Sequence, residues 1–594
     1  MVLVGVALAV PTVAPLAVPS FARPPAGAPT AIWLIVVLAA MVGLPFLALS
    51  SASPTTQRWF AALPGSVEPY RLYAASNAGS LVGLVAYPTL VEPNLDLPDQ
   101  ARWWWLGFAL FVVATAGAAV VVRRKGVGGI EEGSEDLAAP AGSRRLRWAV
   151  LAAVPAALLI GVTTDISTDV AAVPLLWIGP LVVYLATLIV AYARAEPIGL
   201  RVAAVALIPL ALAVALRKLG VIVLPVVPSI GLLLATLAAV GLALHGRLAA
   251  DRPSPAHLTR YSLYVALGGA LGGIAAGVVA PLAFVVPIEG LLVLVVGVLL
   301  ASLPGWWRVA AVPPVVAVAL AIVMTIVGPA GTVRVDRSFY GVYRVAAPTA
   351  DLHVLYSGTT IHGRETFAGP YAGEPLSYYH RAGPLGEVIE SLQAEDSTMR
   401  IGAVGLGAGA IAGYGRPGDT FRFFEIDPTV VSIARDPASF TFLADSAATV
   451  DVDVEDGRLG LESTPADAFD LLVLDAFSSD AVPVHLLTVE SMATSMRTVA
   501  PGGVVAVHIS NRFLDLEPIV AGAAHENGFV SIIGSDLPPP ELNDLADPSQ
   551  WVIVARSFAD VADLVEGDRW RTAHADGKRP WTDRYSDLIG AIRD

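Results

Sequence analysis

A carboxylate at the end of a predicted strand is the residue in this chain best placed to do chemistry. Asp475 directly follows the apolar stretch 469–474, where a strand pattern does not require an acid. A lone carboxylate there could accept a proton from an attacking amine, or orient that amine. The alternative is a turn residue or the N-terminal cap of a helix. We predict that Asp475 is a general base.

A glycine loop and a second carboxylate predict a nucleoside site. Gly405, Gly407 and Gly409 follow the apolar stretch 399–404, and such glycines let the backbone approach a ligand above a helix N-terminus. Glu425 lies 20 positions after Gly405, where a carboxylate can accept both ribose hydroxyls. A third glycine at the dinucleotide spacing is missing, which argues against NAD.

Two further acidic positions extend this predicted site. Asp427 belongs to the same strand end as Glu425, in Glu425-Ile426-Asp427-Pro428. Asp456 and Gly457 follow the third strand, where the carboxylate could accept a hydrogen bond from an adenine amino group. The alternative for this pair is an ordinary Asp-Gly turn.

Alternating strands and helices must position these residues. The strands are predicted at 399–404, 420–426, 449–454, 469–474, 504–509, 529–534 and 550–555, with a helix at 483–499. This is the order of a doubly wound α/β sheet, in which polar residues at the carboxyl ends of strands bind ligands. Upstream, short strands at 332–335, 341–346 and 353–356 predict a small β-domain, followed by a helix at 384–393.

The first half of the chain has a different character. Of the 594 residues 55% are hydrophobic and only 15% are charged, and the mean hydropathy is +0.66. Apolar stretches long enough to span a membrane recur through residues 1–330, and with a weaker apolar stretch at 2–19 they make about ten or eleven helices. We therefore predict a polytopic α-helical membrane domain at 1–330, a small β-rich part at 331–397, and a Rossmann-like nucleoside-binding catalytic domain at 398–594.

The charge distribution separates the same two halves. By count, 38 of the 51 acidic residues follow residue 331, against 19 of the 37 basic ones. An acidic domain of this kind has no basic stripe for phosphates, so nucleic acid is not an expected partner. The chain has no cysteine, which excludes disulfides and thiolate metal sites, and we predict no metal.

Basic loops predict the orientation in the membrane. Arginine and lysine cluster at 123–147, 194–201 and 247–260, and these loops are predicted to be cytoplasmic. Three further spans would then place the soluble domain outside the cell. We favour the cytoplasm because the nucleoside cofactor is made there, which requires one of the last three segments not to span.

A few polar residues interrupt the apolar half. Asp165, Asp169 and Glu289 lie near membrane boundaries, and each is either a functional intramembrane carboxylate or a solvated helix end. Close helix packing is predicted at Gly268, Gly269, Gly272 and Gly273.

A set of short motifs in the soluble half has a family resemblance. The motifs are Gly358-Thr359-Thr360-Ile361-His362-Gly363, Tyr378-Tyr379-His380, Gly405-Leu406-Gly407-Ala408-Gly409, Phe424-Glu425-Ile426-Asp427-Pro428, Asp475-Ala476-Phe477-Ser478-Ser479-Asp480 and Trp581-Thr582-Asp583. Together they resemble the spermidine synthase (polyamine aminopropyltransferase) family, in particular its membrane-fused bacterial members. Further matches lie in the membrane half, at 45–51 and 169–177.

The resemblance implies transfer of an aminopropyl group from decarboxylated S-adenosylmethionine to an amine such as putrescine, with release of methylthioadenosine. On the family pattern Asp475 is the general base and Asp480 a second acid that holds the amine. The pattern also implies roles for Glu425 at the ribose and Asp456-Gly457 at the adenine. The substrate-side residues that it implies are Tyr379, His380 and Glu365.

Departures from the family pattern keep other reactions open. Ala408 stands where family members carry an acid, Arg381 follows the Tyr-His pair, and the spacing from Asp475 to Asp480 is longer than usual. One alternative is a methyltransferase that uses S-adenosylmethionine on a membrane-associated substrate. Another is a transporter or sensor that binds a nucleoside or polyamine without chemistry.

The expected partners and location follow from the predicted membrane domain and from the family resemblance. We expect a small amine substrate, the lipid bilayer of a bacterial-type inner membrane, and a homodimer through the soluble domain. The cofactor is expected to be a co-substrate, decarboxylated S-adenosylmethionine or S-adenosylmethionine itself.

Overall fold

The computed structural model of this protein describes residues 30–63, 68–125, 140–170, 175–193, 200–302, 307–395, 398–476, 483–565 and 567–593. The chain divides into two compact units. A helical unit comprises Met1–Ile166 and Leu175–Val327, and an α/β unit comprises Ser167–Pro174 and Gly328–Asp594.

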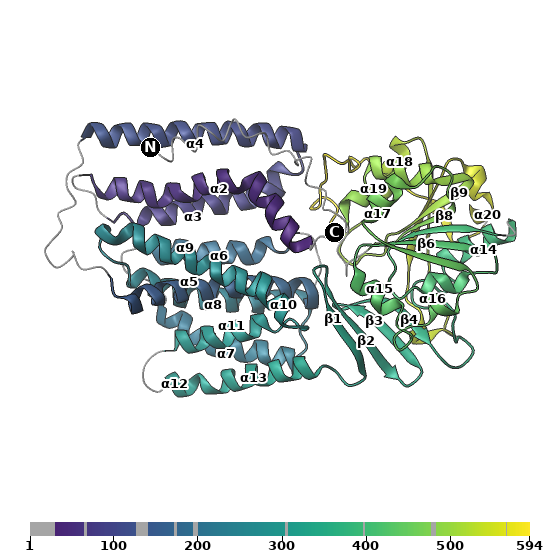
Figure 1. The fold of residues 1–594 in the computed structure, drawn as a ribbon, viewed down its shortest axis with the longest axis horizontal. Helices are drawn as coiled ribbons and strands as arrows, with labels where there is room; N and C mark the ends of the chain where they lie inside the picture. Colours follow the sequence, from purple (N-terminus) through teal and green to yellow (C-terminus); the bar gives the residue numbers. More distant parts are fainter. Residues whose placement is uncertain are drawn as a thin grey trace. The chain divides into compact units, whose positions relative to one another are not determined.

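Long apolar helices that run side by side build the helical unit (Figure 1). The longer ones are α2 (Thr30–Ala61), α3 (Arg71–Ala86), α4 (Leu97–Lys125), α5 (Gly142–Asp165), α6 (Ile178–Tyr192), α7 (Leu200–Lys218), α8 (Val226–Ala250), α9 (Leu258–Ile274), α11 (Glu289–Ala301) and α13 (Val312–Val327). Shorter helical segments are η2 (Tyr87–Val91), η4 (Pro255–His257), η5 (Ala275–Val279), α10 (Ala280–Ala283) and α12 (Trp307–Ala310). A further one, η3 (Ile166–Val170), continues α5 and belongs to the α/β unit after Ile166.

The length and composition of these helices suit a bilayer. In the described part of the chain, seven helices are long and apolar enough to cross a membrane, and α6 and α11 are shorter apolar helices. This confirms the prediction of a strongly apolar helical half. The predicted total of about ten or eleven spans stays a prediction, and the apolar stretch 2–19 lies outside the described residues.

Two of the four predicted packing glycines lie in a tight helix contact. A Cβ atom at Gly268 would lie 2.2 Å from the Ala149 oxygen, and one at Gly272 would lie 2.1 Å from the Ala153 oxygen. These two glycines share one face of α9, so the backbones of α5 and α9 approach each other closely there. Gly269 and Gly273 have no such neighbour within 4 Å among the described residues, so the packing prediction is wrong for them.

The α/β unit begins with a small antiparallel sheet. Its strands are β1 (Thr332–Arg337), β2 (Val342–Thr349), β3 (Leu352–Ser357) and β4 (Thr360–Thr366), in that order across the sheet. The first three match predicted strands. The fourth was not predicted, because its sequence Thr-Ile-His-Gly-Arg-Glu-Thr is mostly polar and contains a glycine.

An eight-stranded sheet forms the centre of the α/β unit. Its strands are β5 (Arg400–Val404), β6 (Thr420–Glu425), β7 (Thr449–Val454), β8 (Phe469–Leu474), β9 (Val499–His508), β10 (Val530–Ser535), β11 (Gln550–Ala555) and β12 (Trp570–Thr572). Their order across the sheet is β12-β10-β11-β9-β8-β5-β6-β7, and the strands from β7 to β9 are parallel.

This order places a topological switch point between β5 and β8. From β5 the chain proceeds outward to β6 and β7, and then returns to β8 and β9 on the other side. Ligands of doubly wound sheets bind at the carboxyl ends of the strands at such a point. The fold therefore brings the loops after β5 and β8 together.

Helices cover both faces of the sheet and bury its strands (Figure 1). The helices are α14 (Pro384–Glu395), α15 (Pro428–Ala434), α16 (Phe442–Asp445), α17 (Gly457–Ser463), α18 (Val489–Thr498), α19 (Glu517–Glu526) and α20 (Ala562–Val565). Central strands such as β5 and β8 are buried along almost their whole length. This explains their continuous apolar sequences, because a strand covered on both faces needs no polar alternation.

Two predicted helices differ from those observed. The glycine loop leads into a five-residue 3-10 helix, η6 (Ala410–Tyr414), and not into an α-helix, so no regular helix N-terminus lies under the loop. Gly413, Gly415 and Pro417 disfavour continuation of a helix there. The helix predicted at 483–499 is divided into η7 (Val484–Leu486) and α18, because Thr488 caps α18 by accepting a hydrogen bond from the Ser491 amide at 3.1 Å.

Candidate active site

A cavity of about 230 Å³ lies at the carboxyl ends of the parallel strands. Its described lining comes from the loops after β5, β6, β7 and β8 and from the small sheet. Among the lining residues are Tyr340, Tyr343, His362, Tyr378, Gly405, Gly407, Glu425, Asp456, Gly457, Asp475 and His485. The predicted nucleoside residues and the predicted base thus share one cavity.

The glycine loop passes too close to its neighbours for any side chain. Gly405 has a φ of +97°, and a Cβ atom there would lie 2.1 Å from the Asp475 oxygen. Gly407 has a φ of +54°, and its Cβ would lie 2.7 Å from the His362 oxygen. Both positions therefore require glycine. Gly409 packs against Leu443 and is not among the described residues that line the cavity.

Glu425 is a buried carboxyl group at the end of β6. It is 8% exposed and accepts hydrogen bonds from the Leu406 amide at 3.0 Å and the Asp427 amide at 2.9 Å. Burial raises the pKa of Glu425 to about 7, although the two amides act in the opposite direction. Hydroxyl donors from a ligand would satisfy the remaining capacity of this group.

Asp456 acts as a helix cap and also lines the cavity. Its side chain accepts a hydrogen bond from the Leu459 amide at 3.1 Å and so begins α17. Its other oxygen lies 3.3 Å from His485 Nε2. Burial would raise the pKa of Asp456, but the hydrogen bonds with His485 and the Leu459 amide, together with the charge of His485, outweigh burial and hold that pKa below its ordinary value. Asp456 can therefore both begin the turn into α17 and face a ligand in the cavity, so the two interpretations of this residue are compatible.

Asp475 lies on the other side of the switch point, with both oxygens engaged. Its side chain is 6% exposed, His508 Nδ1 lies 2.7 Å from Oδ1, and the Tyr379 hydroxyl donates to Oδ2. Burial alone would raise the pKa of Asp475. The charge and hydrogen bond of His508 outweigh burial, with help from Tyr379, so the pKa lies below its ordinary value and the group is a carboxylate at neutral pH.

The hydrogen bonds around His508 define which nitrogen carries its proton. The Gln550 amide donates to Ser510 Oγ at 2.8 Å, and Ser510 Oγ lies 2.8 Å from His508 Nε2. The Asp475 carboxylate can only accept hydrogen bonds, so Nδ1 of His508 carries a proton, whereas the Ser510 hydroxyl can either donate to Nε2 or accept from it. Nδ1–H then donates to Asp475, which fixes the orientation of the carboxylate.

Aromatic rings and a second histidine complete this side of the cavity. The His508 ring is stacked between Tyr378 and Trp551, with centroid distances of 4.5 and 4.7 Å. His362 is buried, and burial lowers its pKa to about 4, although the nearby Asp475 charge acts in the opposite direction. Its Nε2 has no hydrogen-bond partner among the described residues, so this nitrogen can contact a ligand.

The remaining predicted residues that the structure describes form hydrogen bonds or ion pairs with other protein groups, and none is among the described residues lining the cavity. Asp427 is 1% exposed and caps α15 through the Thr429 amide at 2.9 Å. Glu365 is 1% exposed and accepts hydrogen bonds from the Thr441 amide at 2.8 Å and hydroxyl at 2.6 Å.

The Tyr-His pair also has structural partners. His380 is 1% exposed, and its Nε2 lies 2.9 Å from the Asp536 carboxylate. Tyr379 contacts the predicted base and not the open cavity. Geometry therefore does not support direct contact of Asp427 with the cofactor, or of Glu365 and His380 with the substrate. Asp480 lies outside the described residues.

Ala408 is also buried away from the cavity. It is 1% exposed, and a Cβ at Gly363 on β4 would lie 2.6 Å from the Ala408 Cβ. The small sheet thus packs directly against this side of the glycine loop. Ala408 provides no charge at the position where the resembling family carries an acid.

Several residues at the site were not predicted, among them His508, His362, Tyr378 and His485. His508 is the last residue of β9, so the rule that identified Asp475, a polar residue at the carboxyl end of a central strand, also applies to it. His362 and Tyr378 lie within motifs that were noted, but no role had been assigned to them. In the described residues there is no group of three or more His, Cys, Asp or Glu side chains that could hold a metal.

Comparisons with known proteins give matches only to solved structures. No protein-family model matches the chain, and no curated protein matches it. A probable spermidine synthase from Corynebacterium glutamicum ATCC 13032 is 19% identical, with a TM-score of 0.32, over 44% of this chain and 98% of that one. The spermidine synthase of Thermotoga maritima is 11% identical, with a TM-score of 0.30, over 44% of this chain and 84% of that one.

A methyltransferase fold is also among the matches. Precorrin-6y C5,15-methyltransferase from Geobacter metallireducens GS-15 is 14% identical, with a TM-score of 0.23, over 29% of this chain and 88% of that one. These scores are too low to carry functional inference, and the strand order and the cavity must carry it instead.

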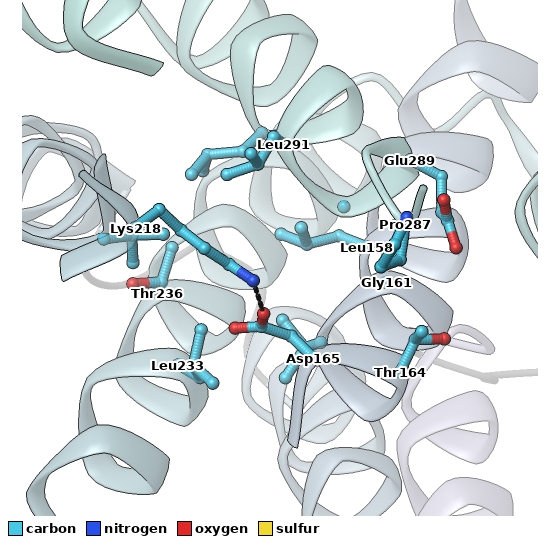
Figure 2. Close-up of a pocket in the computed structure, with 14 residues that line it drawn as sticks. Leu158, Gly161, Thr164, Asp165, Lys218, Leu233, Thr236, Pro287, Glu289 and Leu291 are labelled. Atoms are coloured by element: carbon cyan, nitrogen blue, oxygen red, sulfur yellow. Dashed lines mark ion pairs between the residues drawn. The ribbon is translucent and has the colours of Figure 1, made fainter. Parts of the chain in front are cut away.

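The helical unit contains a separate cluster of charges (Figure 2). Asp165, at the end of α5, forms ion pairs with Arg217 and Lys218 at the end of α7, and all three side chains are 12–13% exposed. Glu289, 4% exposed, lies across a cavity of about 30 Å³ that Asp165 and Lys218 also line. Asp165 and Glu289 are therefore not solvated helix ends. The side chain of Asp169 lies outside those described.

Proposed function

We propose that this chain is a membrane-bound transferase of the spermidine synthase type. It would move an aminopropyl group from decarboxylated S-adenosylmethionine to an amine such as putrescine. The observation that carries this proposal is the pairing of Asp475, held as a carboxylate by His508, with Glu425 in one cavity.

The two sides of the cavity suit the two reactants. Glu425 and Asp456 would accept hydrogen bonds from the ribose hydroxyls and the adenine amino group, while the glycine loop lets the nucleoside approach the backbone. Asp475 would attract the acceptor ammonium and take its proton. The amine nitrogen then forms a bond to the carbon beside the sulfonium, and the carbon–sulfur bond breaks, so that the electron pair neutralises sulfur in methylthioadenosine.

Purified full-length protein tests the reaction directly. Mass spectrometry should detect spermidine and methylthioadenosine in equal amounts from putrescine and decarboxylated S-adenosylmethionine. Asp475→Asn should lower the rate of formation of both products about 10³-fold while nucleoside binding, measured by calorimetry, persists. Binding without turnover in the wild-type protein would contradict the transferase and favour a sensor or transporter.

One observation favours a second candidate, an S-adenosylmethionine-dependent methyltransferase acting on a membrane-associated substrate. Ala408 is buried and uncharged, so the glycine loop offers no acid for the aminopropyl ammonium. The discriminating measurement is the ratio of the affinities for S-adenosylmethionine and its decarboxylated form. Tighter binding of S-adenosylmethionine, with S-adenosylhomocysteine as the product, would favour the methyltransferase.

The proposed location is a bacterial-type inner membrane, with the helical unit in the bilayer and the α/β unit in the cytoplasm. Seven helices of suitable length and composition support membrane insertion. A cysteine substitution at Ser557, which is exposed on the α/β unit, would report sidedness by labelling with an impermeant maleimide in intact cells, because the chain has no native cysteine. Labelling of the Ser557→Cys variant from outside would contradict a cytoplasmic α/β unit.

A further inference from the structure

A second cavity in the helical unit is much larger than the one beside Asp165. Its volume is about 650 Å³, and helices α2, α3, α5, α6, α8 and α9 enclose it. Protein interiors rarely leave voids of this size, whereas pockets for small organic molecules typically have such volumes. The charge cluster of Figure 2, in contrast, surrounds only about 30 Å³.

Aromatic rings form much of the wall. Five tyrosines line the cavity: Tyr70, Tyr73, Tyr184, Tyr192 and Tyr261. Several rings meet edge to face, including Tyr73 with Tyr192 at 4.8 Å and Tyr70 with Tyr261 at 5.9 Å. Such a panel is rigid and favours contact with another flat ring.

Three of the tyrosine hydroxyls are used within the protein. Tyr70 donates to the Pro253 oxygen at 2.8 Å, and Tyr261 donates to the Leu248 oxygen at 2.9 Å. A hydroxyl has a single proton, so in the contact between Tyr192 and Tyr261 the donor is Tyr192. These rings therefore present mainly carbon surface to a ligand.

His245 provides a polar group with a defined character. It is 1% exposed and lines the cavity, and its Nδ1 lies 3.0 Å from Thr187 Oγ1. Thr187 donates its one proton to the Tyr184 carbonyl at 2.7 Å, so Nδ1–H of the histidine must be the donor to Thr187. In a singly protonated ring Nε2 is then an acceptor, and it has no hydrogen-bond partner among the described residues.

The other residues that line the cavity indicate which charge a ligand can carry and from which side it can enter. No Asp, Glu, Lys or Arg is among the described residues that line the cavity. Phe46, Leu263 and Leu267 line it and are also 69%, 55% and 46% exposed on helices long and apolar enough to span a membrane. A ligand would therefore enter between α2 and α9 from the bilayer and would carry no net charge.

The geometry points to a binding site for an uncharged, bilayer-dissolved amphiphile whose flat ring carries a hydroxyl group. The ring would pack on the tyrosine panel, the hydroxyl would donate to His245 Nε2, and the apolar tail would extend past Phe46 and Leu263. This site goes beyond the transferase reaction and rests only on the proposed membrane insertion of the helical unit.

Full-length protein in phosphatidylcholine nanodiscs tests the site with two tritium-labelled probes. The first is n-decylhydroquinone, and the second is its dimethyl ether, which has no hydroxyl donor. Wild-type protein should bind the hydroquinone saturably and about tenfold more tightly than the ether, which is the effect of one buried hydrogen bond. Equal affinity for the two probes, or no saturable binding, would overturn the proposal.

Variants identify the acceptor. His245→Phe should bind both probes alike, whereas His257→Phe, which changes a histidine outside the cavity, should keep the tenfold preference. Thr187→Val removes the partner of Nδ1–H and should reduce the preference even if His245→Phe does not fold. Unchanged preference in either His245→Phe or Thr187→Val would overturn the assignment.

Two further measurements separate this proposal from the transferase reaction. Asp475→Asn should bind the hydroquinone as tightly as wild type, because the probe does not require turnover. Flotation of the protein with lipid vesicles tests insertion independently. Loss of probe binding in a protein that floats and transfers aminopropyl groups would overturn the site alone.

Discussion

The two sides of the active-site cavity hold carboxyl groups with similar burial and opposite protonation behaviour. Glu425, at the end of β6, is 8% exposed as a residue, and the side chain of Asp475, directly after β8, is 6% exposed. Burial raises the pKa of Glu425 to about 7, because two backbone amides only partly offset the desolvation. The pKa of Asp475 is lowered, because the charge and hydrogen bond of His508, together with the hydrogen bond from Tyr379, outweigh its desolvation.

The difference shows how one cavity can prepare two tasks. Glu425 is suited to bind a neutral ribose, because hydrogen bonds from the ribose hydroxyls favour its carboxylate form and so promote its ionisation when the ligand binds. A group that is charged beforehand is suited to attract an ammonium ion and receive its proton. The partners of each carboxyl group, more than its burial, therefore decide its role.

The charged side of the cavity should have the largest effect on turnover. Asp475→Asn keeps the size of the side chain but removes the base, so we expect the rate of aminopropyl transfer to fall about 10³-fold. Initial rates from mass spectrometry of spermidine measure this effect. Asp451→Asn, an exposed acid on β7, is the matched control and should retain wild-type rates. A similar loss in both variants would show that Asp475 is not the base.

The nucleoside side should respond to pH. Glu425 binds ribose hydroxyls as a carboxylate, and with a pKa of about 7 it is mostly protonated at lower pH. The affinity for methylthioadenosine should therefore rise as the pH increases. We expect a gain of roughly thirtyfold from pH 5.5 to pH 8, with a plateau above that. Calorimetry in buffers of different ionisation enthalpy should also detect release of about one proton on binding at pH 6.

The variants for this pH effect are Glu425→Gln and a surface control. Glu425→Gln should bind weakly, with a flat pH profile, because the amide does not titrate. Glu526→Gln changes an exposed glutamate on α19 and should reproduce the wild-type profile. A slope that persists in Glu425→Gln would assign the titration to another group.

Removing the partner of Asp475 should make the two carboxyl groups more alike. His508→Phe keeps a ring between Tyr378 and Trp551 but removes the hydrogen bond to Asp475. Burial then dominates, the pKa of Asp475 rises, and the acid limb of the pH–rate profile should move to higher pH. We expect a loss of about tenfold in rate at pH 7.

The control for the shift of the acid limb is a histidine that does not contact Asp475. His525→Phe, at the exposed end of α19, should leave the acid limb in place. A uniform loss of rate at every pH in His508→Phe, without movement of the limb, would mean that His508 only positions the stacked rings.

The sequence predicted the α/β fold well because burial and periodicity agree there. β5 and β8 read as continuous apolar runs, since both faces of the sheet are covered, and the alternation with helices then implied the doubly wound order. β4 was missed because its polar residues gain their burial from the small sheet. The short helix predicted after the glycine loop is of the 3-10 type, because Gly413, Gly415 and Pro417 disfavour a longer α-helix there.

The cavity was predictable in outline, but the pairs within it were not. Gly405, Glu425 and Asp475 come at strand ends, where chain order alone predicts that they converge. The contact between Asp475 and His508 depends on the register of β8 with β9, which pairs Leu474 with Val507 and places the next residues side by side. Likewise, the hydrogen bond from the Thr441 amide to Glu365 joins segments that are distant in the sequence, which no local sequence pattern predicts.

The smallest expected effect concerns Asp456, which distinguishes adenine recognition from helix capping. Asparagine caps helices as well as aspartate, so Asp456→Asn should preserve the start of α17 while it weakens the hydrogen bond to an adenine amino group. We expect a loss of about threefold in affinity for methylthioadenosine and no loss for methylthioinosine, which lacks that amino group. Because the pKa of Asp456 is lowered, the effect should be the same at pH 6 and pH 8, unlike that of Glu425. Equal losses for the two nucleosides would show that Asp456 serves α17 alone, and the nucleoside side of the cavity would then depend on Glu425 and the glycine loop.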